Sequence, residues 1–204
     1  MSLYAESVGV DGLLVVTPYY NKTNAEGLIM HFKAINDAVK TPIILYNVPG
    51  RTNMNITPET LLKLIQLNNV IAIKEASGDL SQVAKMKALC QDKIDIYSGN
   101  DDLIIPTLSL GGIGVISVAA NIIPKEIHDM CDLYLNGDCF KATKLQLDYL
   151  ELLNDLFIET NPIPVKTAMN IMKMNVGELR LPLYKMNDKN KKTLENTLKK
   201  YNLI

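Results

Sequence analysis

The feature that most constrains the fold is a series of short apolar runs, each followed by turn residues and then by an amphipathic stretch. The runs begin roughly 20 to 30 residues apart, the interval that a strand with its crossover helix needs. They are GLLVVTP (12–18), PIILYNVP (42–49), VIAIKEAS (70–77), IDIYSG (94–99) and GVISVAAN (114–121). Buried strands that alternate with helices predict a parallel sheet wrapped by helices.

The segments between these runs show helical spacing and helix-start signals. Apolar side chains recur three or four positions apart, which predicts helices that bury one face. These stripes are Leu28, Phe32 and Ile35; Leu61, Leu64 and Ile65; and Val83, Met86 and Cys90. The N-cap candidates are Thr57 before Pro58, Asp79 and Asp138. The segment YAESVG (4–9) is also helix-like, and the residues after 121 keep a helical pattern.

Two architectures fit this alternation, an open doubly wound sheet and a (β/α)₈ barrel. A glycine-rich phosphate loop would favour the first, but the sequence has no G-x-G-x-x-G or Walker motif. The nearest glycine cluster, GGIG (111–114), precedes a strand instead of opening a helix. Polar residues instead follow the strand ends, which share one mouth in a barrel. They are Tyr19, Tyr20 and Asn21; Tyr46, Asn47 and Arg51; Lys74 and Glu75; Ser98, Gly99 and Asn100; and Asn121.

The strand count predicts an incomplete barrel. Eight βα units need about 250 residues, whereas this chain has 204 residues and five strand candidates. We therefore predict an α/β fold with a partial barrel over residues 1–121. Residues 122–204 are expected to form the last barrel helix and a helical extension of the same domain.

Lys74 emerges where an apolar, β-branched run stops. An ammonium beside so much hydrocarbon reaches out to water, pairs with a carboxylate such as Glu75, or has a lowered pKa because its charged form is poorly solvated. The third option makes an amine nucleophile. The run VIAIKEAS (70–77) alone leaves all three options open.

Tyr46 ends the preceding strand, so its phenol is expected about 5 Å away from the Lys74 strand. An amine that attacks a ketone needs a nearby group that donates and accepts protons, and a tyrosine serves if its pKa is lowered or if it relays protons. Arg51, after a Pro-Gly turn, is suited to bind a carboxylate in a bidentate manner. The alternatives are a packing aromatic for Tyr46 and a surface cation for Arg51.

Composition excludes several classes of function. Apolar residues make up 48% of the chain, charged residues 21%, and the net charge is −1, which gives no bias toward nucleic acid or membrane surfaces. The three cysteines, Cys90, Cys131 and Cys139, lack metal-ligand spacing and are expected to be buried thiols in a reducing compartment. We therefore expect a cytoplasmic protein without a metal site, nucleic-acid partner or membrane partner.

Six ordered motifs carry a family resemblance that spans the chain from about Tyr4 to its C-terminus. They are TPYYNK (17–22), YNVPGRT (46–52), IKEASGD (73–79), SGND (98–101), GVISV (114–118) and NPIPVK (161–166). In this order and spacing the chain resembles the dihydrodipicolinate synthase family of the pyruvate-dependent class I aldolases. The resemblance implies condensation of pyruvate with aspartate semialdehyde in lysine and diaminopimelate biosynthesis, through a covalent imine and without a cofactor.

The resemblance also implies catalytic roles for three residues. Lys74 is expected to form the Schiff base with pyruvate, and Tyr46 to relay protons and position the imine. Tyr20 resembles a tyrosine that reaches across a tight dimer into the partner's site, so a homo-oligomer is expected.

Four further positions match family residues that bind small molecules. Arg51 resembles the arginine that binds the carboxylate of aspartate semialdehyde. Gly99 and Ile116 match positions that line the pyruvate pocket, the latter through its carbonyl. Tyr19 matches an aromatic near the lysine inhibitor site of feedback-regulated members.

The resemblance implies that three βα units of the family lie ahead of the TPYY strand, so the retained strands would be the fourth to the eighth. A threonine loop that binds the pyruvate carboxylate belongs to those units, and we expect the chain alone to be weakly active or inactive. Two alternatives are an N-acetylneuraminate lyase-like pyruvate aldolase and a non-catalytic partial-barrel interaction module. Arg51 favours the synthase over the lyase.

Overall fold

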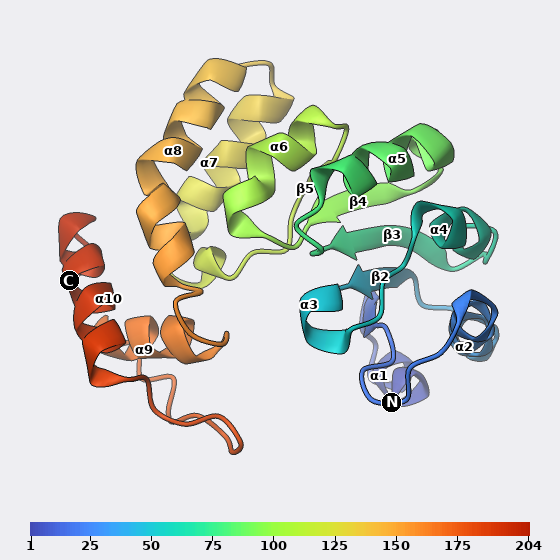
Figure 1. Ribbon diagram of the computed structural model, residues 1–204, viewed down its shortest axis with the longest axis horizontal. Helices are drawn as coiled ribbons and strands as arrows, with labels where there is room; N and C mark the ends of the chain where they lie inside the picture. The colour runs from blue at the N-terminus through green and yellow to red at the C-terminus, as the bar shows by residue number, and fades with distance from the viewer. The chain divides into compact units, whose positions relative to one another are not determined.

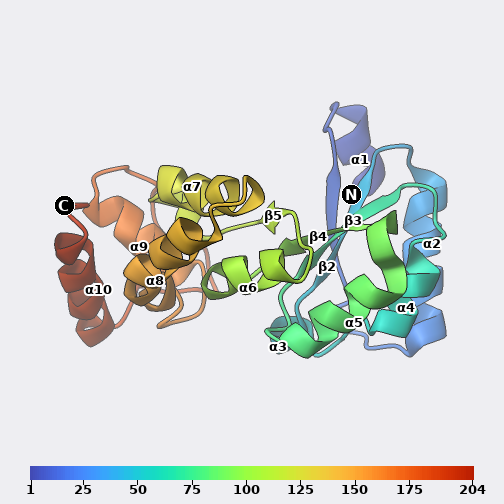
Figure 2. The same cartoon turned by 90° about the horizontal axis from the view of Figure 1, so that it is seen from above.

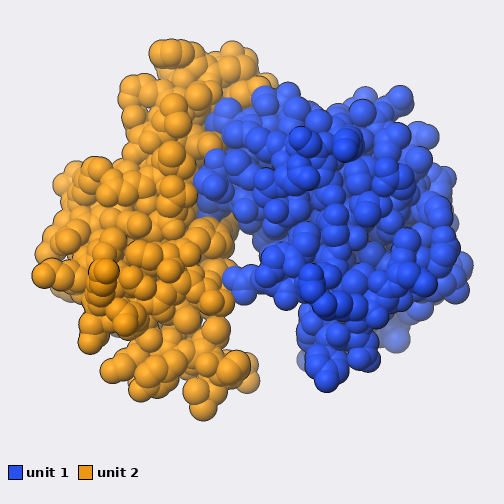
Figure 3. Space-filling view, in the orientation of Figure 1, with its two compact units in different colours: residues 1–116 blue, residues 117–204 orange.

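The computed structural model describes residues 1–204, and the chain divides into two compact units. The first comprises residues 1–116 and the second residues 117–204 (Figure 3). The predicted boundary at residue 121, and the prediction that both parts form one domain, stay predictions.

The first unit is built on a parallel sheet of five strands. These are β1 (Leu13–Val16), β2 (Ile43–Asn47), β3 (Val70–Glu75), β4 (Asp95–Ser98) and β5 (Gly114–Val115). Their spatial order is β1-β2-β3-β4-β5, so every strand pairs with its neighbour in sequence. A doubly wound sheet reverses its strand order at a switch point, whereas a (β/α)₈ barrel does not. The partial-barrel prediction is therefore confirmed.

Helices connect the strands of the first unit. They are α1 (Ser2–Ser7), α2 (Ala25–Ala38), α3 (Pro49–Thr52), α4 (Pro58–Leu64), α5 (Leu80–Cys90) and α6 (Ile104–Ser109), with 3₁₀ turns at Gln91–Lys93 and Asp101–Leu103. Helix α4 packs between α2 and α5, and the three helices lie along one face of the sheet (Figures 1 and 2). This arrangement covers one face of each strand and leaves the other to the barrel interior.

The core of this unit lies between the sheet and these helices. Its members include the apolar stripes expected from the sequence, with Leu28, Phe32, Leu61, Val83 and Met86 all buried. On β2 and β3, Leu45 and Ile73 are paired and fully buried in this cluster. Because side chains alternate along a strand, the residues next to Leu45 and Ile73 point to the opposite face.

The expected helix caps are present. Thr57 accepts a hydrogen bond from the Thr60 N–H, and Asp79 accepts one from the Gln82 N–H. In the second unit, Asp138 accepts one from the Lys141 N–H. These bonds satisfy N–H groups that the first turn of a helix leaves without a partner.

The second unit is helical. Its elements are a 3₁₀ turn at Ala119–Asn121 and helices α7 (Pro124–Leu135), α8 (Cys139–Asp155), α9 (Ile163–Ile171) and α10 (Asp188–Lys200). Helix α7 packs along α8, and α10 packs on both α8 and α9. The rings of Tyr149 and Tyr201 stack with their centroids 5.0 Å apart.

Three expectations differ from the structure. Strand β5 ends at Val115 instead of reaching residue 120, because it pairs only with β4 and the chain then turns into a 3₁₀ helix. Ile71 is 48% exposed instead of covered, next to a register shift between β2 and β3. Cys139 is exposed and Cys131 half-buried, so only Cys90 is the buried thiol expected. None of the helices is both long enough and apolar enough to span a membrane.

Candidate active site

Lys74 and Tyr46 lie opposite each other at the carboxyl ends of β3 and β2. The two residues are paired in the parallel register, and their side chains share the sheet face that the helices leave uncovered. The Lys74 Nζ lies 4.5 Å from the centroid of the Tyr46 ring. The sheet therefore places an amine over a phenol, as the strand pattern predicts.

Burial controls the state of the Lys74 amine. Its side chain is only 9% exposed, and desolvation lowers its pKa because the ammonium loses water that the site does not replace. A neutral amine is the nucleophilic form. The alternative that Lys74 pairs with Glu75 is wrong, since no ion pair joins them and the Glu75 oxygens accept hydrogen bonds from Asn47, Ser77 and Gln82.

Tyr46 is half-buried, and its desolvation raises its pKa, against a smaller lowering influence of the nearby Arg51 charge. The phenol thus keeps its proton at neutral pH. The option of a lowered Tyr46 pKa is therefore wrong, and a protonated phenol that relays protons remains.

Arg51 reaches the site from the short helix α3, which directly follows β2. Pro49 starts this helix, and Asn53 ends it with a left-handed φ of 53°. The neighbouring Thr52 is buried, and its hydroxyl accepts a hydrogen bond from the Thr17 hydroxyl at 3.1 Å, which ties α3 to the end of β1. The Arg51 side chain is exposed, and its charge lowers the pKa of Lys74.

Asp101 is a neighbour of Lys74 that the sequence reasoning missed. It is 1% exposed in the turn after β4, and its negative charge raises the Lys74 pKa, in opposition to desolvation. The motif SGND (98–101) is visible in the sequence, but burial of its aspartate is a tertiary property that the motif does not encode. The Lys74 amine is therefore balanced between a dry environment and one buried carboxylate.

Gly99 packs directly against Lys74. A methyl group added at Gly99 would lie 2.5 Å from the Ala76 Cβ and 3.1 Å from the Lys74 Cε, closer than carbon atoms normally approach. The Gly99 N–H donates to the Glu75 carbonyl at 2.7 Å, and the Ile116 N–H donates to the Ser98 carbonyl at 2.9 Å. The ends of β3, β4 and β5 are thus held together around the lysine.

Tyr19 and Tyr20 lie apart from this group. They follow β1 and are 73% and 86% exposed, and no interaction joins either side chain to Lys74 or Tyr46. Their expected roles at an inhibitor site and across a dimer stay predictions.

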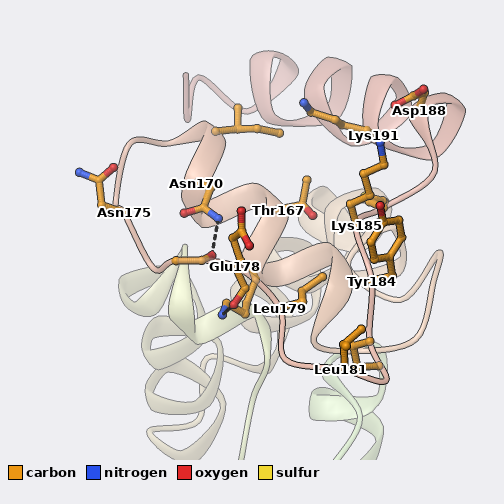
Figure 4. A pocket seen from close by; sticks show the side chains of 15 residues that line it. Thr167, Asn170, Asn175, Glu178, Leu179, Leu181, Tyr184, Lys185, Asp188 and Lys191 are labelled. Atoms are coloured by element: carbon orange, nitrogen blue, oxygen red, sulfur yellow. Dashed lines mark hydrogen bonds between the residues drawn. The ribbon is translucent and has the colours of Figure 1, made fainter.

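A cavity of about 1060 Å³ lies in the second unit, and none of the residues predicted for the site lines it. Figure 4 shows its wall, where the Asn170 amide donates to the Gly177 carbonyl at 2.9 Å. Lys166 donates to the Glu178 carbonyl at 2.5 Å, and the Val176 N–H donates to Asn170 at 3.0 Å. These bonds fix the segment that follows α9.

Comparison with known proteins identifies relatives over the full length of the chain. The model of the dihydrodipicolinate synthetase family matches residues 1–201. The 4-hydroxy-tetrahydrodipicolinate synthase of Clostridium novyi is 67% identical over 202 residues, which cover 99% of this chain and 68% of the relative.

Solved structures agree with this match. A crystallised dihydrodipicolinate synthase superposes with a TM-score of 0.95 at 50% identity, covering 100% of this chain and 70% of that chain. The chloride-inhibited dihydrodipicolinate synthase of Acinetobacter baumannii complexed with pyruvate has a TM-score of 0.95 at 40% identity. That match covers 98% of this chain and 69% of that chain.

Proposed function

Because the chain belongs to the dihydrodipicolinate synthetase family, we propose that its site carries out the chemistry of a 4-hydroxy-tetrahydrodipicolinate synthase. In this proposal Lys74 forms an imine with pyruvate, which then condenses with aspartate semialdehyde. The observation that carries the proposal is the buried Lys74 amine, with its lowered pKa, over the Tyr46 phenol.

The first half of the reaction needs one nucleophile and a proton carrier. The neutral Lys74 Nζ attacks the keto carbon of pyruvate to form a carbinolamine, and the loss of water from the carbinolamine leaves the imine. Tyr46, protonated at neutral pH, supplies a proton to the departing oxygen and takes one back in a relay. The covalent imine takes the place of a metal or an organic cofactor.

The second half begins when the methyl group of the imine loses a proton. The resulting enamine carbon attacks the aldehyde carbon of aspartate semialdehyde and forms the new carbon–carbon bond, while the aldehyde C=O π bond breaks and its oxygen takes up a proton. The amino group of the bound product then attacks the imine carbon and displaces the Lys74 amine, which releases the product. Arg51 binds the carboxylate of this aldehyde, because an exposed guanidinium beside the site offers a bidentate partner. Gly99 and Ile116 line the space around pyruvate.

The remaining assignments rest on the family. We propose a homo-oligomer in which Tyr20 acts in a partner's site and Tyr19 lies near an inhibitor site, since both are exposed in the single chain. A cytoplasmic location fits the three free cysteines. The relatives compared above are named as synthases, which favours a synthase over a sugar-acid lyase.

Borohydride reduction in the presence of pyruvate tests the proposal. Reduction converts an imine into a stable secondary amine, so peptide mass mapping should find one adduct, on Lys74. Lys74→Ala should carry none, while Lys63→Ala, which removes an exposed lysine of α4, should trap as the wild type does. An adduct on several lysines, or none, would refute the assignment.

Arg51→Ala separates the two substrates. The imine with pyruvate should still form, because Arg51 is assigned to the second substrate. Addition of aspartate semialdehyde should consume the imine more slowly than in the wild type. Loss of pyruvate trapping in Arg51→Ala would instead give Arg51 a structural role.

A further inference from the structure

Asn47 and Glu75 lie one residue beyond Tyr46 and Lys74 on the same two strands. They are paired in the β2–β3 register, and their side chains point to the helix-covered face, away from the amine and the phenol. Both are buried, with exposed fractions of 0% for Asn47 and 4% for Glu75. A buried amide and a buried carboxylate need hydrogen bonds to be tolerated there.

Their side chains bond to each other and to the backbone around the site. The Asn47 amide Nδ2 donates to the Glu75 Oε2 at 2.8 Å, which joins the ends of β2 and β3. The Asn47 Oδ1 accepts the Ile56 N–H at 2.9 Å, and the Glu75 Oε1 accepts the Ser77 N–H at 2.6 Å. The two side chains thus connect the ends of β2 and β3 to each other, and each also binds a backbone N–H in the segment that follows its own strand.

Two further amides complete the network. Asn55 accepts the second Asn47 Nδ2 hydrogen at 2.8 Å and donates to the Gln82 Oε1 at 2.7 Å. The Gln82 Nε2 donates to Asn55 at 3.1 Å and to the Glu75 Oε2 at 3.4 Å. Gln82 belongs to α5, so the network connects the strand ends to the helix layer.

We propose that Asn47 and Glu75 are positioning residues for the imine chemistry. Their mutual hydrogen bond fixes the backbone one residue beyond Tyr46 and Lys74, and the Asn47 bond to Ile56 closes the segment that carries Arg51. The inference rests on the proposed function of Lys74. Neither residue touches the reacting atoms; both act through the residues that do.

The directions of the hydrogen bonds indicate that the network needs Glu75 as a carboxylate. The three groups that bond to its side chain, the Ser77 N–H and the amides of Asn47 and Gln82, are donors, so both oxygens accept. Burial raises the pKa of the Glu75 carboxyl, and these hydrogen bonds oppose that rise because they favour the carboxylate. Glu75→Gln leaves the volume of the side chain almost unchanged but replaces one acceptor oxygen by an NH₂ donor. This NH₂ would face either the Ser77 N–H or the Asn47 NH₂, so two donors would meet. Asn47 cannot turn its amide round, because the Ile56 N–H needs the Asn47 oxygen.

A reversal of polarity offers a rescue. In Asn47→Asp alone, two carboxylates would face each other across β2 and β3. In the double variant Asn47→Asp with Glu75→Gln, one oxygen of the new carboxylate on β2 still accepts the Ile56 N–H, and the other accepts from the new amide on β3. The amides of Asn55 and Gln82 can rotate by half a turn. Each bond between two side chains is then kept with its direction reversed, and the bonds from the Ile56 and Ser77 N–H groups keep their direction.

The test measures the rate of borohydride trapping of pyruvate on Lys74 in the wild type, the two single variants and the double variant. A loss of about tenfold or more is expected in each single variant, since small displacements of reacting groups cost rates of that order. The double variant should recover most of this loss. Asn69→Asp is the matched control. Asn69 lies just before the amino end of β3, at the opposite end of the strand from Lys74, and its amide donates to the Asn36 and Val39 carbonyls. This variant should trap at the wild-type rate even if it is less stable.

Two measurements without pyruvate keep this inference separate from the proposed function. Hydrogen exchange at the Ile56 N–H should speed up in both single variants and slow again in the double variant. The pH of half-maximal acetylation of Lys74 by acetic anhydride should move up toward that of an ordinary lysine in Glu75→Gln, because a loosened strand end admits water. The loss of the Glu75 charge by itself would move this pH down, so an upward shift reports the loosening and not the charge.

Failure of the wild type to trap pyruvate would overturn the proposed function, and the acetylation profiles would then decide the inference alone. A Glu75→Gln variant whose acetylation midpoint is not raised would overturn the positioning role. The positioning role would also be overturned if the acetylation profile of the double variant were no closer to that of the wild type than the profiles of the single variants are. Where the wild type traps pyruvate, a double variant that traps no faster than the single variants would overturn it as well.

Discussion

At the scale of single residues, the chemistry depends on two opposed influences on Lys74. Desolvation lowers its pKa, and the buried Asp101 charge raises it. Reaction with pyruvate needs the neutral amine, so the trapping rate should increase with pH and reach half its maximum below 10.5, the ordinary lysine pKa. Asp101→Asn removes the raising influence and should move this midpoint to still lower pH.

The pH profiles of trapping in the wild type and in Asp101→Asn check this prediction. Asp102→Asn is the control, because it removes the adjacent carboxylate, whereas the charges that shift the Lys74 pKa are those of Asp101 and Arg51. An upward shift in Asp101→Asn would mean that the buried carboxylate does not act on the amine through its charge.

Gly99 should tolerate no side chain. A methyl group at this position would meet the Ala76 Cβ at 2.5 Å and the Lys74 Cε at 3.1 Å, so β3 and β4 would have to separate. We expect Gly99→Ala to lower the free energy of unfolding by about 1 to 3 kcal/mol, the range for overpacking, and to slow trapping on Lys74. Gly50→Ala, where nothing lies within 4 Å of the added methyl group, should behave as the wild type. Equal unfolding midpoints in urea for the two variants would contradict this packing argument.

At the scale of elements, helix caps should affect stability without affecting chemistry. The Asn24 side chain caps the N-terminus of α2 by accepting a hydrogen bond from the Gly27 N–H at 2.9 Å. This cap is far from Lys74 in the sequence. Asn24→Ala should lower the free energy of unfolding by about 1 kcal/mol. Asn24→Asp keeps the acceptor and should stay near the wild type, with trapping unchanged in both variants. A slower trapping rate in Asn24→Ala would show that α2 influences the site.

The pattern of elements was predictable because it depends on local rules. Apolar runs at βα spacing predicted every strand, and the caps Thr57, Asp79 and Asp138 predicted helix starts. The parallel register then brings Tyr46 beside Lys74 without further information. The length of β5 was not predictable, since strand length depends on how many neighbours a strand pairs with.

Burial and side-chain partners were the part that the sequence did not reveal. Glu75 follows Lys74 directly, but side chains alternate along β3, so its carboxylate lies on the other face of the sheet. There it accepts hydrogen bonds from the amides of Asn47 and Gln82. Asp101 belongs to a polar loop motif, which ordinarily suggests an exposed residue, but the structure buries it. Such features depend on contacts between distant segments.

At the scale of the whole molecule, a buried functional lysine should reduce stability. The unfolded chain holds the Lys74 proton with the ordinary pKa of 10.5, and the folded chain holds it less tightly. Between the lowered folded pKa and 10.5 the unfolded state binds more protons, so this group makes stability rise with pH in that window. Lys74→Met should therefore unfold at higher urea concentration than the wild type at pH 7.

The difference between the two proteins should shrink as the pH rises toward 10.5, because the wild-type amine then becomes neutral in both states. Urea unfolding of both proteins at several pH values measures it. A Lys74→Met variant that is less stable at every pH would mean that the ammonium is well solvated or well paired in the folded chain.

The account depends on a covalent bond between Lys74 and a keto acid, and one experiment observes that bond directly. Protein with ¹⁵N in its lysine side chains is mixed with pyruvate labelled with ¹³C at the keto carbon, and a one-bond ¹³C–¹⁵N coupling is sought by nuclear magnetic resonance. We predict one coupled signal, absent in Lys74→Met. A keto carbon that stays uncoupled in the wild type, or that remains coupled in Lys74→Met, would contradict the account.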